Sequence, residues 1–276
     1  MIYGLKTVAK YWLGTDRAER NFAVYPDDTF IVSYPRSGNT WTRFLIANLL
    51  YPDKKVSFAN IEKLIPDTSS QSNLALKRTP RPRIIKTHEY FDHRYPKTIY
   101  IVRDPRDVAV SYYDFQRKYR QIDDDYPLDS YVDDFISGRL NSADWGTWSE
   151  NVASWLYTRG QRRNFLLLRY EEMIQDTVGQ LARIAVFLRV EADSARLTRA
   201  VELSSADRMR ELEKLETGQW VATRGRRQDI PFIGVAKAGG WRTSLPASCV
   251  DKIESTWGEL MTTLGYGLAS NKQATV

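Results

Sequence analysis

The stretch FIVSYPRSGNTW, residues Phe30–Trp41, predicts a strand, a tight loop and the start of a helix. Phe30 to Val32 are typical of the end of a buried strand, and apolar residues recur at helical spacing over 41–49. Pro35 interrupts the chain in between, and Gly38 lets the backbone approach a ligand closely. Because the first turn of a helix leaves N–H groups without partners, the stretch predicts an anion site.

The side chains of this loop suit a phosphate or a sulfate. Arg36 offers a fixed positive charge, and Ser37 and Thr40 offer hydroxyls. The alternative is an ordinary strand-to-helix turn with a cap. The nucleoside-triphosphatase pattern G-x-x-x-x-G-K-[ST] is absent, since Ser33 replaces its first glycine and Asn39 its lysine. We therefore expect a phosphate loop but not an ATPase.

The length of 276 residues suits one α/β domain. No linker divides the chain, so we expect a single domain over 1–276, with a core at about 20–268 and a loose tail at 269–276. The net charge of +6 favours anionic partners, but it does not choose among nucleic acid, a membrane surface and a small polyanion.

The cellular setting is predicted from cysteine use and from the N-terminus. Cys249 is the only cysteine, which excludes an intrachain disulfide and favours the cytoplasm. The N-terminal MIYGLKTVAKYWLG is interrupted by Lys6 and Lys10, so it predicts neither a signal peptide nor a membrane span.

Three further short strands are predicted, and each is followed by polar residues. They lie around Ile84 and Ile85 before Lys86, Thr87 and His88; over Thr98–Arg103 before Asp104, Pro105 and a helix through Ser111; and over Asn164–Arg169 before Tyr170. Strands separated by helices predict a parallel sheet, whose ligands bind at the carboxyl ends of the strands. The polar clusters should therefore meet at one edge.

Each polar residue also has a simpler explanation. Arg103 could pair with Asp104 or Asp107, Lys86 could be a solvated strand end, and a lone histidine is more often structural. The shared position at one sheet edge favours function instead, and it makes His88 a candidate catalytic residue.

Two longer motifs identify a family resemblance. YPRSGNTW at Tyr34–Trp41 resembles Y-P-[KR]-S-G-[TN]-T-W, and YIVRDPRDVAVSYY at Tyr100–Tyr113 resembles Y-[IV]-V-R-[ND]-P-[KR]-D-V-x-V-S-x-Y. Both are marks of cytosolic-type sulfotransferases, which use 3′-phosphoadenosine-5′-phosphosulfate as donor. KTH, RYEEM, GGWR and LMTTLGY follow in family order. The resemblance implies an α/β fold, a P-loop-type three-layer sandwich with a central, mostly parallel sheet flanked by helices.

The resemblance also implies a role for each residue. The phosphosulfate would bind Arg36, Ser37, Gly38, Asn39 and Thr40; the adenine would contact Trp41 and Tyr170; and the 3′-phosphate would bind Arg103 and Ser111. His88 would be the general base for an acceptor hydroxyl or amine in an in-line displacement, and Lys86 and Arg36 would stabilise the transferred group and the leaving group. The acceptor would be a small molecule rather than nucleic acid, and no metal is implied.

The chain departs from the family pattern at the 3′-phosphate and at the adenine. Many members carry Arg-Lys-Gly before the late Gly-x-Trp, where this chain has Gly234, Val235 and Ala236. Lys237 is the first candidate to compensate, and Arg242, Arg224, Arg226 and Arg227 are others. Ala206 replaces a phenylalanine expected on the adenine, and the family's dimer motif is not evident, which leaves the oligomeric state open.

Other functions stay open at the level of sequence. The lost triplet is compatible with a donor-binding protein that has no transfer activity, the basic charge with a nucleic-acid binder, and the loop with a P-loop kinase, although the missing Walker lysine argues against the last. Aromatic residues that could line an acceptor pocket, or simply be core, are Tyr90, Phe91, Tyr112, Trp145 and Trp148. Asn151 lies near a position where relatives often carry histidine.

Overall fold

The computed structural model describes residues 16–216, 218–220, 222–234 and 236–269. One parallel sheet with the strand order β2-β1-β3-β4 lies at its centre. Its strands are β1 (Thr29–Ser33), β2 (Ile84–Thr87), β3 (Thr98–Val102) and β4 (Phe165–Arg169). All four predicted strands are confirmed, although β3 ends one residue earlier than expected and β4 begins one residue later.

Helices connect the strands and cover the sheet. They are α2 (Asn39–Leu50), α3 (Ile61–Leu64), α4 (Asn73–Arg78), α5 (Pro105–Lys118), α6 (Leu128–Ser137), α7 (Trp148–Arg159), α8 (Tyr170–Gln175), α9 (Thr177–Leu188), α10 (Ser194–Leu203), α11 (Ala206–Leu215), α12 (Trp241–Ser244) and α13 (Ala247–Thr263). Within the described ranges, no helix is both long enough and apolar enough to cross a membrane.

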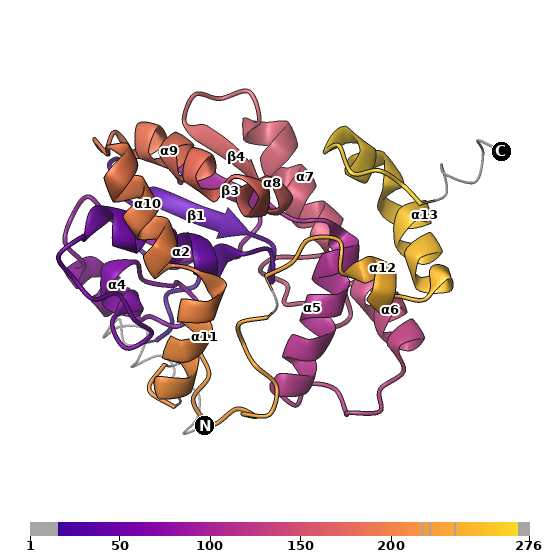
Figure 1. Ribbon diagram of the computed structural model, residues 1–276. Coiled ribbons are helices and arrows are strands. Elements are labelled where there is room, and N and C mark those ends of the chain that lie inside the picture. The colour runs from indigo at the N-terminus through magenta and orange to yellow at the C-terminus, as the bar shows by residue number, and fades with distance from the viewer. Residues whose placement is uncertain (1–15, 217, 221, 235, 270–276) are drawn as a thin grey trace, which may run out of the picture.

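The sheet separates two hydrophobic cores, because side chains alternate between its faces. Phe30 and Val32 pack with residues of α5, α6, α7 and α13. Ile31 and Ile99 point the other way and pack with residues of α2, α9 and α10. Figure 1 shows the two groups of helices on either side of the strands. The predicted three-layer α/β sandwich is confirmed.

The register brings the carboxyl ends of the strands to one edge. Val32 pairs with Thr87 of β2 and with Tyr100 of β3, so β1 ends between its two neighbours. α2 begins directly after the loop that follows β1. α5 begins as predicted, with Asp104 accepting a hydrogen bond from the Arg106 N–H and with Pro105 in the first turn. These connections place the polar residues that follow the strands around one edge.

Candidate functional site

The loop after β1 has the backbone shape of an anion cradle. Arg36 and Gly38 both have positive φ angles, 67° and 99°. Ser37 between them is fully buried, and its Oγ has no hydrogen-bond partner among the described residues. A buried hydroxyl without a partner is unfavourable unless a ligand satisfies it. This loop at the start of α2 therefore fits a bound oxyanion.

Gly38 is required by its surroundings. A Cβ atom at this position would lie 2.6 Å from Cδ2 of Tyr170, the first residue of α8. The sequence predicted both residues as donor-binding, and the structure places them against each other. The loop can lie on the Tyr170 ring only because position 38 has no side chain.

Arg36 joins two predicted donor residues. Its Nε donates to Ser111 Oγ at 3.1 Å, and its Nη2 donates to the Phe232 carbonyl at 3.1 Å. Burial, and then the nearby Arg103, lower the pKa of Arg36 to about 10. No carboxylate of the described residues lies within ion-pairing distance of this guanidinium, so its charge is not neutralised locally.

Arg103 brings a second charge of the same kind. Its Nη1 donates to the Arg36 carbonyl at 3.0 Å, its Nη2 donates to the Lys237 carbonyl at 3.3 Å, and its guanidinium carbon lies 4.4 Å from the centre of the Tyr170 ring. The alternative pairing with Asp104 or Asp107 is not seen. Asp104 pairs with Arg106 at 2.6 Å.

Asp107 has a different role. Its two oxygens accept hydrogen bonds from the Gly239 and Trp241 N–H groups at 2.7 and 2.9 Å. It therefore fixes the late Gly-Gly-Trp segment to the start of α5. Two arginines that have no carboxylate partner in the described ranges then meet at the loop after β1, which makes this edge electropositive and suited to an anion.

Trp41 and Tyr170 lie next to each other, as expected of two residues at one ligand. Their ring centres are 5.9 Å apart and their planes are inclined by 74°. Trp41 Nε1 donates to the Ser204 carbonyl at 3.0 Å, which fixes the indole at the end of α10. Tyr170 follows β4 and opens α8, so two separate connections of the sheet build this aromatic corner.

His88 is held in the tautomer that a general base needs. Its Nδ1 lies 2.8 Å from the Ser33 carbonyl, an acceptor, so Nδ1 carries the proton and Nε2 keeps its lone pair. Burial, and then the charge of Lys86, lower the pKa of His88 to about 3. The imidazole is therefore neutral at physiological pH.

The Lys86 ammonium is buried and paired with a residue that the sequence did not indicate. Its Nζ lies 2.7 Å from Asp67 Oδ2, and the two residues are 5% and 9% exposed. Asp67 lies on the chain between α3 and α4, and only the fold brings it beside β2.

Asn39 and Thr40 occupy the first turn of α2. The Asn39 amide turns toward the sheet, where Nδ2 donates to Ser33 Oγ at 3.1 Å and to the Thr87 carbonyl at 3.3 Å. Asn39 thus ties the loop to the ends of β1 and β2. Its Oδ1 has no hydrogen-bond partner in the described part of the chain.

The aromatic residues suggested for an acceptor pocket separate into two groups. Trp148 and Tyr112 are core residues, and Trp148 Nε1 donates to the Arg103 carbonyl at 3.1 Å. Trp145 instead lies beside His88, with ring centres 6.2 Å apart. Asn151 donates to the carbonyls of His88 and Trp145 at 2.9 and 3.0 Å, and thereby holds both segments.

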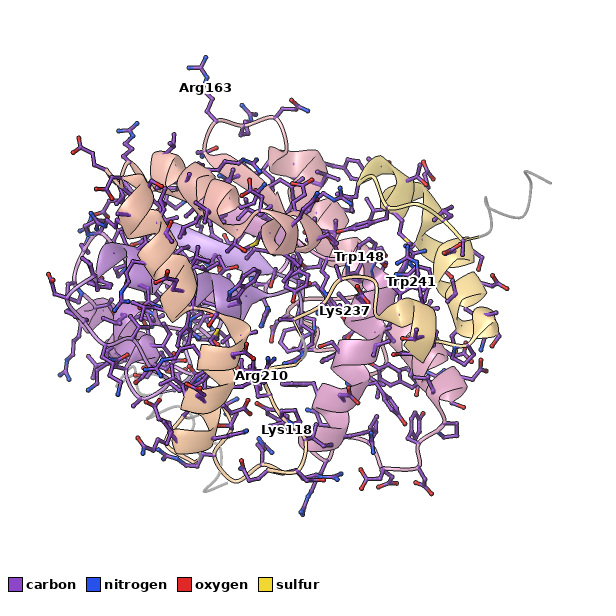
Figure 2. The ribbon with its side chains drawn as sticks, in the orientation of Figure 1. Lys118, Trp148, Arg163, Arg210, Lys237 and Trp241 are labelled. Carbon is purple, nitrogen blue, oxygen red and sulfur yellow. The ribbon has the colours of Figure 1, made fainter. Side chains whose placement is uncertain are left out.

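The segment that replaces the missing triplet contacts three arginines. Carbonyls of Phe232, Gly234 and Lys237 accept hydrogen bonds from Arg36, Arg210 and Arg103. Val235 lies outside the described residues. The Lys237 side chain is exposed, and Arg210 extends from α11 to this segment (Figure 2). Sequence analysis missed Arg210, because nothing in a lone arginine on an amphipathic helix indicates what it faces.

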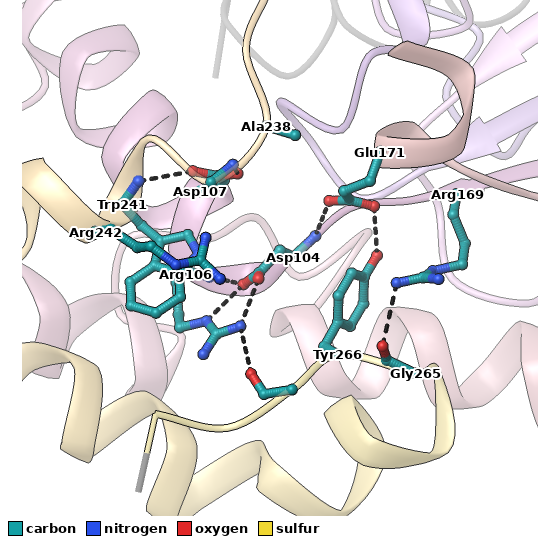
Figure 3. Close-up of a pocket in the computed structure, with 12 residues that line it drawn as sticks. Asp104, Arg106, Asp107, Arg169, Glu171, Ala238, Trp241, Arg242, Gly265 and Tyr266 are labelled. Carbon is teal, nitrogen blue, oxygen red and sulfur yellow. Dashed lines mark hydrogen bonds and ion pairs between the residues drawn. The ribbon is translucent and has the colours of Figure 1, made fainter. Parts of the chain in front are cut away.

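The other proposed substitutes bind elsewhere. Arg224 donates to the Gly218 carbonyl at 3.1 Å, Arg226 lies over the Tyr119 ring, and Arg227 pairs with Asp124 and Asp229. Arg242 lies over the Trp241 ring and lines a separate cavity of about 250 Å³ between the Gly-Gly-Trp segment and the end of α13, shown in Figure 3.

Known proteins resemble this chain in sequence. A family model described as a sulfotransferase domain matches residues 26–265. Sulfotransferase 1B1 of Mus musculus is 27% identical over 294 residues, covering 96% of this chain and 93% of the mouse protein. The 3-beta-hydroxysteroid sulfotransferase of Cavia porcellus is 28% identical over 251 residues, covering 87% of this chain and 85% of that protein.

Solved structures share the fold. Mouse sulfotransferase SULT7A1 complexed with PAP superposes with a TM-score of 0.72 at 24% identity, covering 88% of this chain and 87% of that one. Retinol dehydratase in complex with androsterone and inactive cofactor PAP gives a TM-score of 0.71 at 22% identity, covering 88% and 83%.

Proposed function

Because the chain belongs to the sulfotransferase domain family, we propose that it moves a sulfuryl group from 3′-phosphoadenosine-5′-phosphosulfate to a hydroxyl or amine of a small-molecule acceptor. The observation on which the proposal depends is the convergence of Arg36 and Arg103, both without carboxylate partners among the described residues, on a loop with a buried unpaired hydroxyl at Ser37. Such a site is unfavourable when it is empty, and an anion would supply the missing charge and acceptors.

Different residues of this site suit different parts of the donor molecule. The backbone N–H groups of 36–40 and the Ser37 hydroxyl suit the 5′-phosphosulfate, Trp41 and Tyr170 suit the adenine, and Arg103 with Ser111 suits the 3′-phosphate. The bound donor supplies an activated sulfuryl group on a good leaving group. The protein positions the reactants and stabilises charge, as in phosphoryl transfer.

His88 takes the proton of the acceptor. Its neutral state and free Nε2 are those of a general base, a role worth about 10² to 10⁴ in rate. A donor bound in the loop adds negative charge near the ring, which raises the pKa of His88 toward a value that suits proton transfer. Trp145 gives the acceptor side an aromatic wall.

The wider setting of this activity also belongs to the proposal. We expect the enzyme to work in the cytoplasm without a metal and without nucleic acid as partner. Similar proteins include a 3-beta-hydroxysteroid sulfotransferase and a retinol dehydratase solved with retinol or androsterone, so apolar hydroxyl compounds are the first acceptors to try.

The test compares ligands by thermal shift. Adenosine 3′,5′-bisphosphate at about 100 times its dissociation constant should stabilise the fold by about 2.7 kcal/mol, and AMP and ATP at equal concentration should stabilise it much less. An equal shift with all three would refute a 3′-phosphate site. A specific shift without turnover on a panel of alcohols, phenols and amines would favour the alternative of a donor-binding protein that has no transfer activity.

A further inference from the structure

The Lys86–Asp67 pair is built into the sheet edge. The Lys86 N–H donates to the Pro66 carbonyl at 2.8 Å, and the Thr68 N–H donates to the Lys86 carbonyl at 3.0 Å. The chain at Asp67 therefore runs parallel to β2 for one bridge. These two backbone hydrogen bonds link Lys86 to the residues before and after Asp67. They therefore fix the position of the Asp67 carboxylate relative to the Lys86 ammonium.

The Asp67 carboxylate is oriented by its own contacts. Oδ1 accepts hydrogen bonds from the Ser69 N–H at 2.9 Å and from the Ser69 hydroxyl at 2.8 Å, which leaves Oδ2 for Lys86. Among the described residues, Asp67 is the only hydrogen-bond partner of the Lys86 ammonium. An ammonium has three N–H donors, so two remain for oxygens of a ligand.

Of the other charged groups around the pair, Arg43 of α2 pairs with Glu62 of α3 at 3.0 Å, whereas Arg36 has no carboxylate partner among the described residues. His88, which follows β2, is neutral. The charge of Asp67 acts on Tyr119 at the end of α5, and the charge of Arg36 acts on the His88 ring. Burial raises the pKa of Asp67, but Lys86, Arg43 and His88 outweigh it and hold that pKa below its ordinary value.

We propose that Asp67 is a positioning residue for sulfuryl transfer: it keeps the buried Lys86 ammonium protonated and directs two of its N–H donors toward the transferred group. This inference rests on the proposed function. Burial lowers the pKa of Lys86, and Arg43 lowers it further, whereas Asp67 is the main group that opposes both. Without Asp67, the ammonium would lose its proton at a lower pH.

The first measurement is the titration of Lys86 in protein labelled with ¹³C at the lysine ε-carbons, with the resonance assigned by its loss in Lys86→Met. In the wild-type protein Lys86 should be protonated at physiological pH. In Asp67→Asn its apparent pKa should fall by about 1 unit or more. A neutral wild-type Lys86 at physiological pH, or an unchanged pKa in the variant, would overturn the proposal.

The second measurement is kcat against pH. A catalytic ammonium works below its pKa and fails as pH rises through it, so the alkaline limb of Asp67→Asn should move to lower pH. A pKa shift of about 1 unit lowers kcat by at most about 10-fold, so at about pH 9 the kcat of the variant should be about three- to 10-fold below wild type, and near pH 6 the two should agree within about twofold. Asp67→Glu, which keeps the charge, should restore the alkaline limb.

Asp28→Asn is the matched control. Asp28 pairs with Arg83 at 2.5 Å, both side chains are fully buried, and the pair lies at the opposite end of β1. This variant should lower Tm without moving the alkaline limb. If wild type transfers no sulfuryl group, the proposed function fails, but the Lys86 titration still tests the charge coupling. If wild type is active and Asp67→Asn keeps its pH profile, only the role of Asp67 fails.

Discussion

The state of His88 predicts how activity depends on pH. Its pKa in the folded protein is about 3, far below the ordinary value of 6.5, and a general base must be neutral. Because kcat/KM reports the ionisation of the free enzyme, it should not fall as pH drops from about 8 to about 5. A pH series with donor and acceptor both far below saturation measures this, because bound donor raises the pKa of His88. An acid limb near pH 6.5 that disappears in a variant at position 88 would show that the ring is not buried in solution.

His88→Ala separates the roles of the ring. Loss of the base should lower kcat by about 10² to 10⁴. Binding of adenosine 3′,5′-bisphosphate, measured by calorimetry, should change by less than about threefold, because the contacts with the donor lie elsewhere. Transfer at the wild-type rate would refute the assigned base.

Gly38→Ala tests how closely the loop lies on Tyr170. The substitution combines a left-handed backbone, which costs about 1 kcal/mol or more, with a contact of 2.6 Å to the ring. We expect Tm to fall and the thermal shift with the bisphosphate to disappear. Gly218→Ala is the control, because Gly218 also has a positive φ of 79° but, chain neighbours aside, no atom of the described residues lies within 4 Å of the position that its Cβ would take. If Tm and the thermal shift with the bisphosphate fell equally in both variants, backbone strain alone would explain the effect of Gly38→Ala.

At the scale of elements, α11 anchors the segment that replaces the family triplet. Glu213 accepts hydrogen bonds from the Phe232 and Ile233 N–H groups at 2.6 and 2.9 Å, and Arg210 donates to the Gly234 carbonyl at 3.0 Å. A helix turn separates the two side chains, so one face of α11 holds both. Arg210, which also pairs with Asp207 at 2.5 Å, thus brings a guanidinium to position 234, where many relatives carry an arginine.

Arg210→Ala should therefore weaken binding of adenosine 3′,5′-bisphosphate by about 10-fold, the effect of losing one charge-assisted hydrogen bond. Binding of 5′-AMP should be unchanged, because AMP has no 3′-phosphate. Calorimetry with both nucleotides measures the difference. Arg208→Ala is the control, since Arg208 pairs with Glu211 at 3.1 Å on the exposed side of the same helix. If the binding of both nucleotides weakens equally, Arg210 only holds the segment at Gly234 in place and does not contact the 3′-phosphate.

At the scale of the whole molecule, the two cores share one sheet. Alternate residues of the same strands enter different cores, so neither core can lose its packing while the other keeps its strands. We expect one cooperative unfolding transition, with far-UV circular dichroism and tryptophan fluorescence changing together. Two separate transitions would contradict a single domain. The stretches 16–20 and 267–269 pack or bond onto this unit, through Ala18 and Ala269 for example, and the rest of the expected tail, 270–276, lies outside the described residues.

Residue patterns were enough to predict the local structure and the chemical character of the site. The four strands, the cap at Asp104 and the glycine at 38 follow from periodicity and from backbone sterics, which act over a few residues. The parallel sheet then followed from the alternation of strands and helices, and it brought Lys86, His88, Arg103 and Tyr170 to one edge.

Which charges meet could not be predicted from residue patterns, because it depends on the assembled fold. Asp67 lies 19 residues from Lys86, and Arg210 lies 24 residues from Gly234, in segments with no motif. Likewise, the sequence allowed Arg103 to pair with Asp104 or Asp107, but the fold gives those carboxylates to Arg106 and to the Gly239 and Trp241 N–H groups. The reason is physical: backbone preference is local, whereas Coulomb attraction and burial depend on distances that exist only after the sheet has assembled.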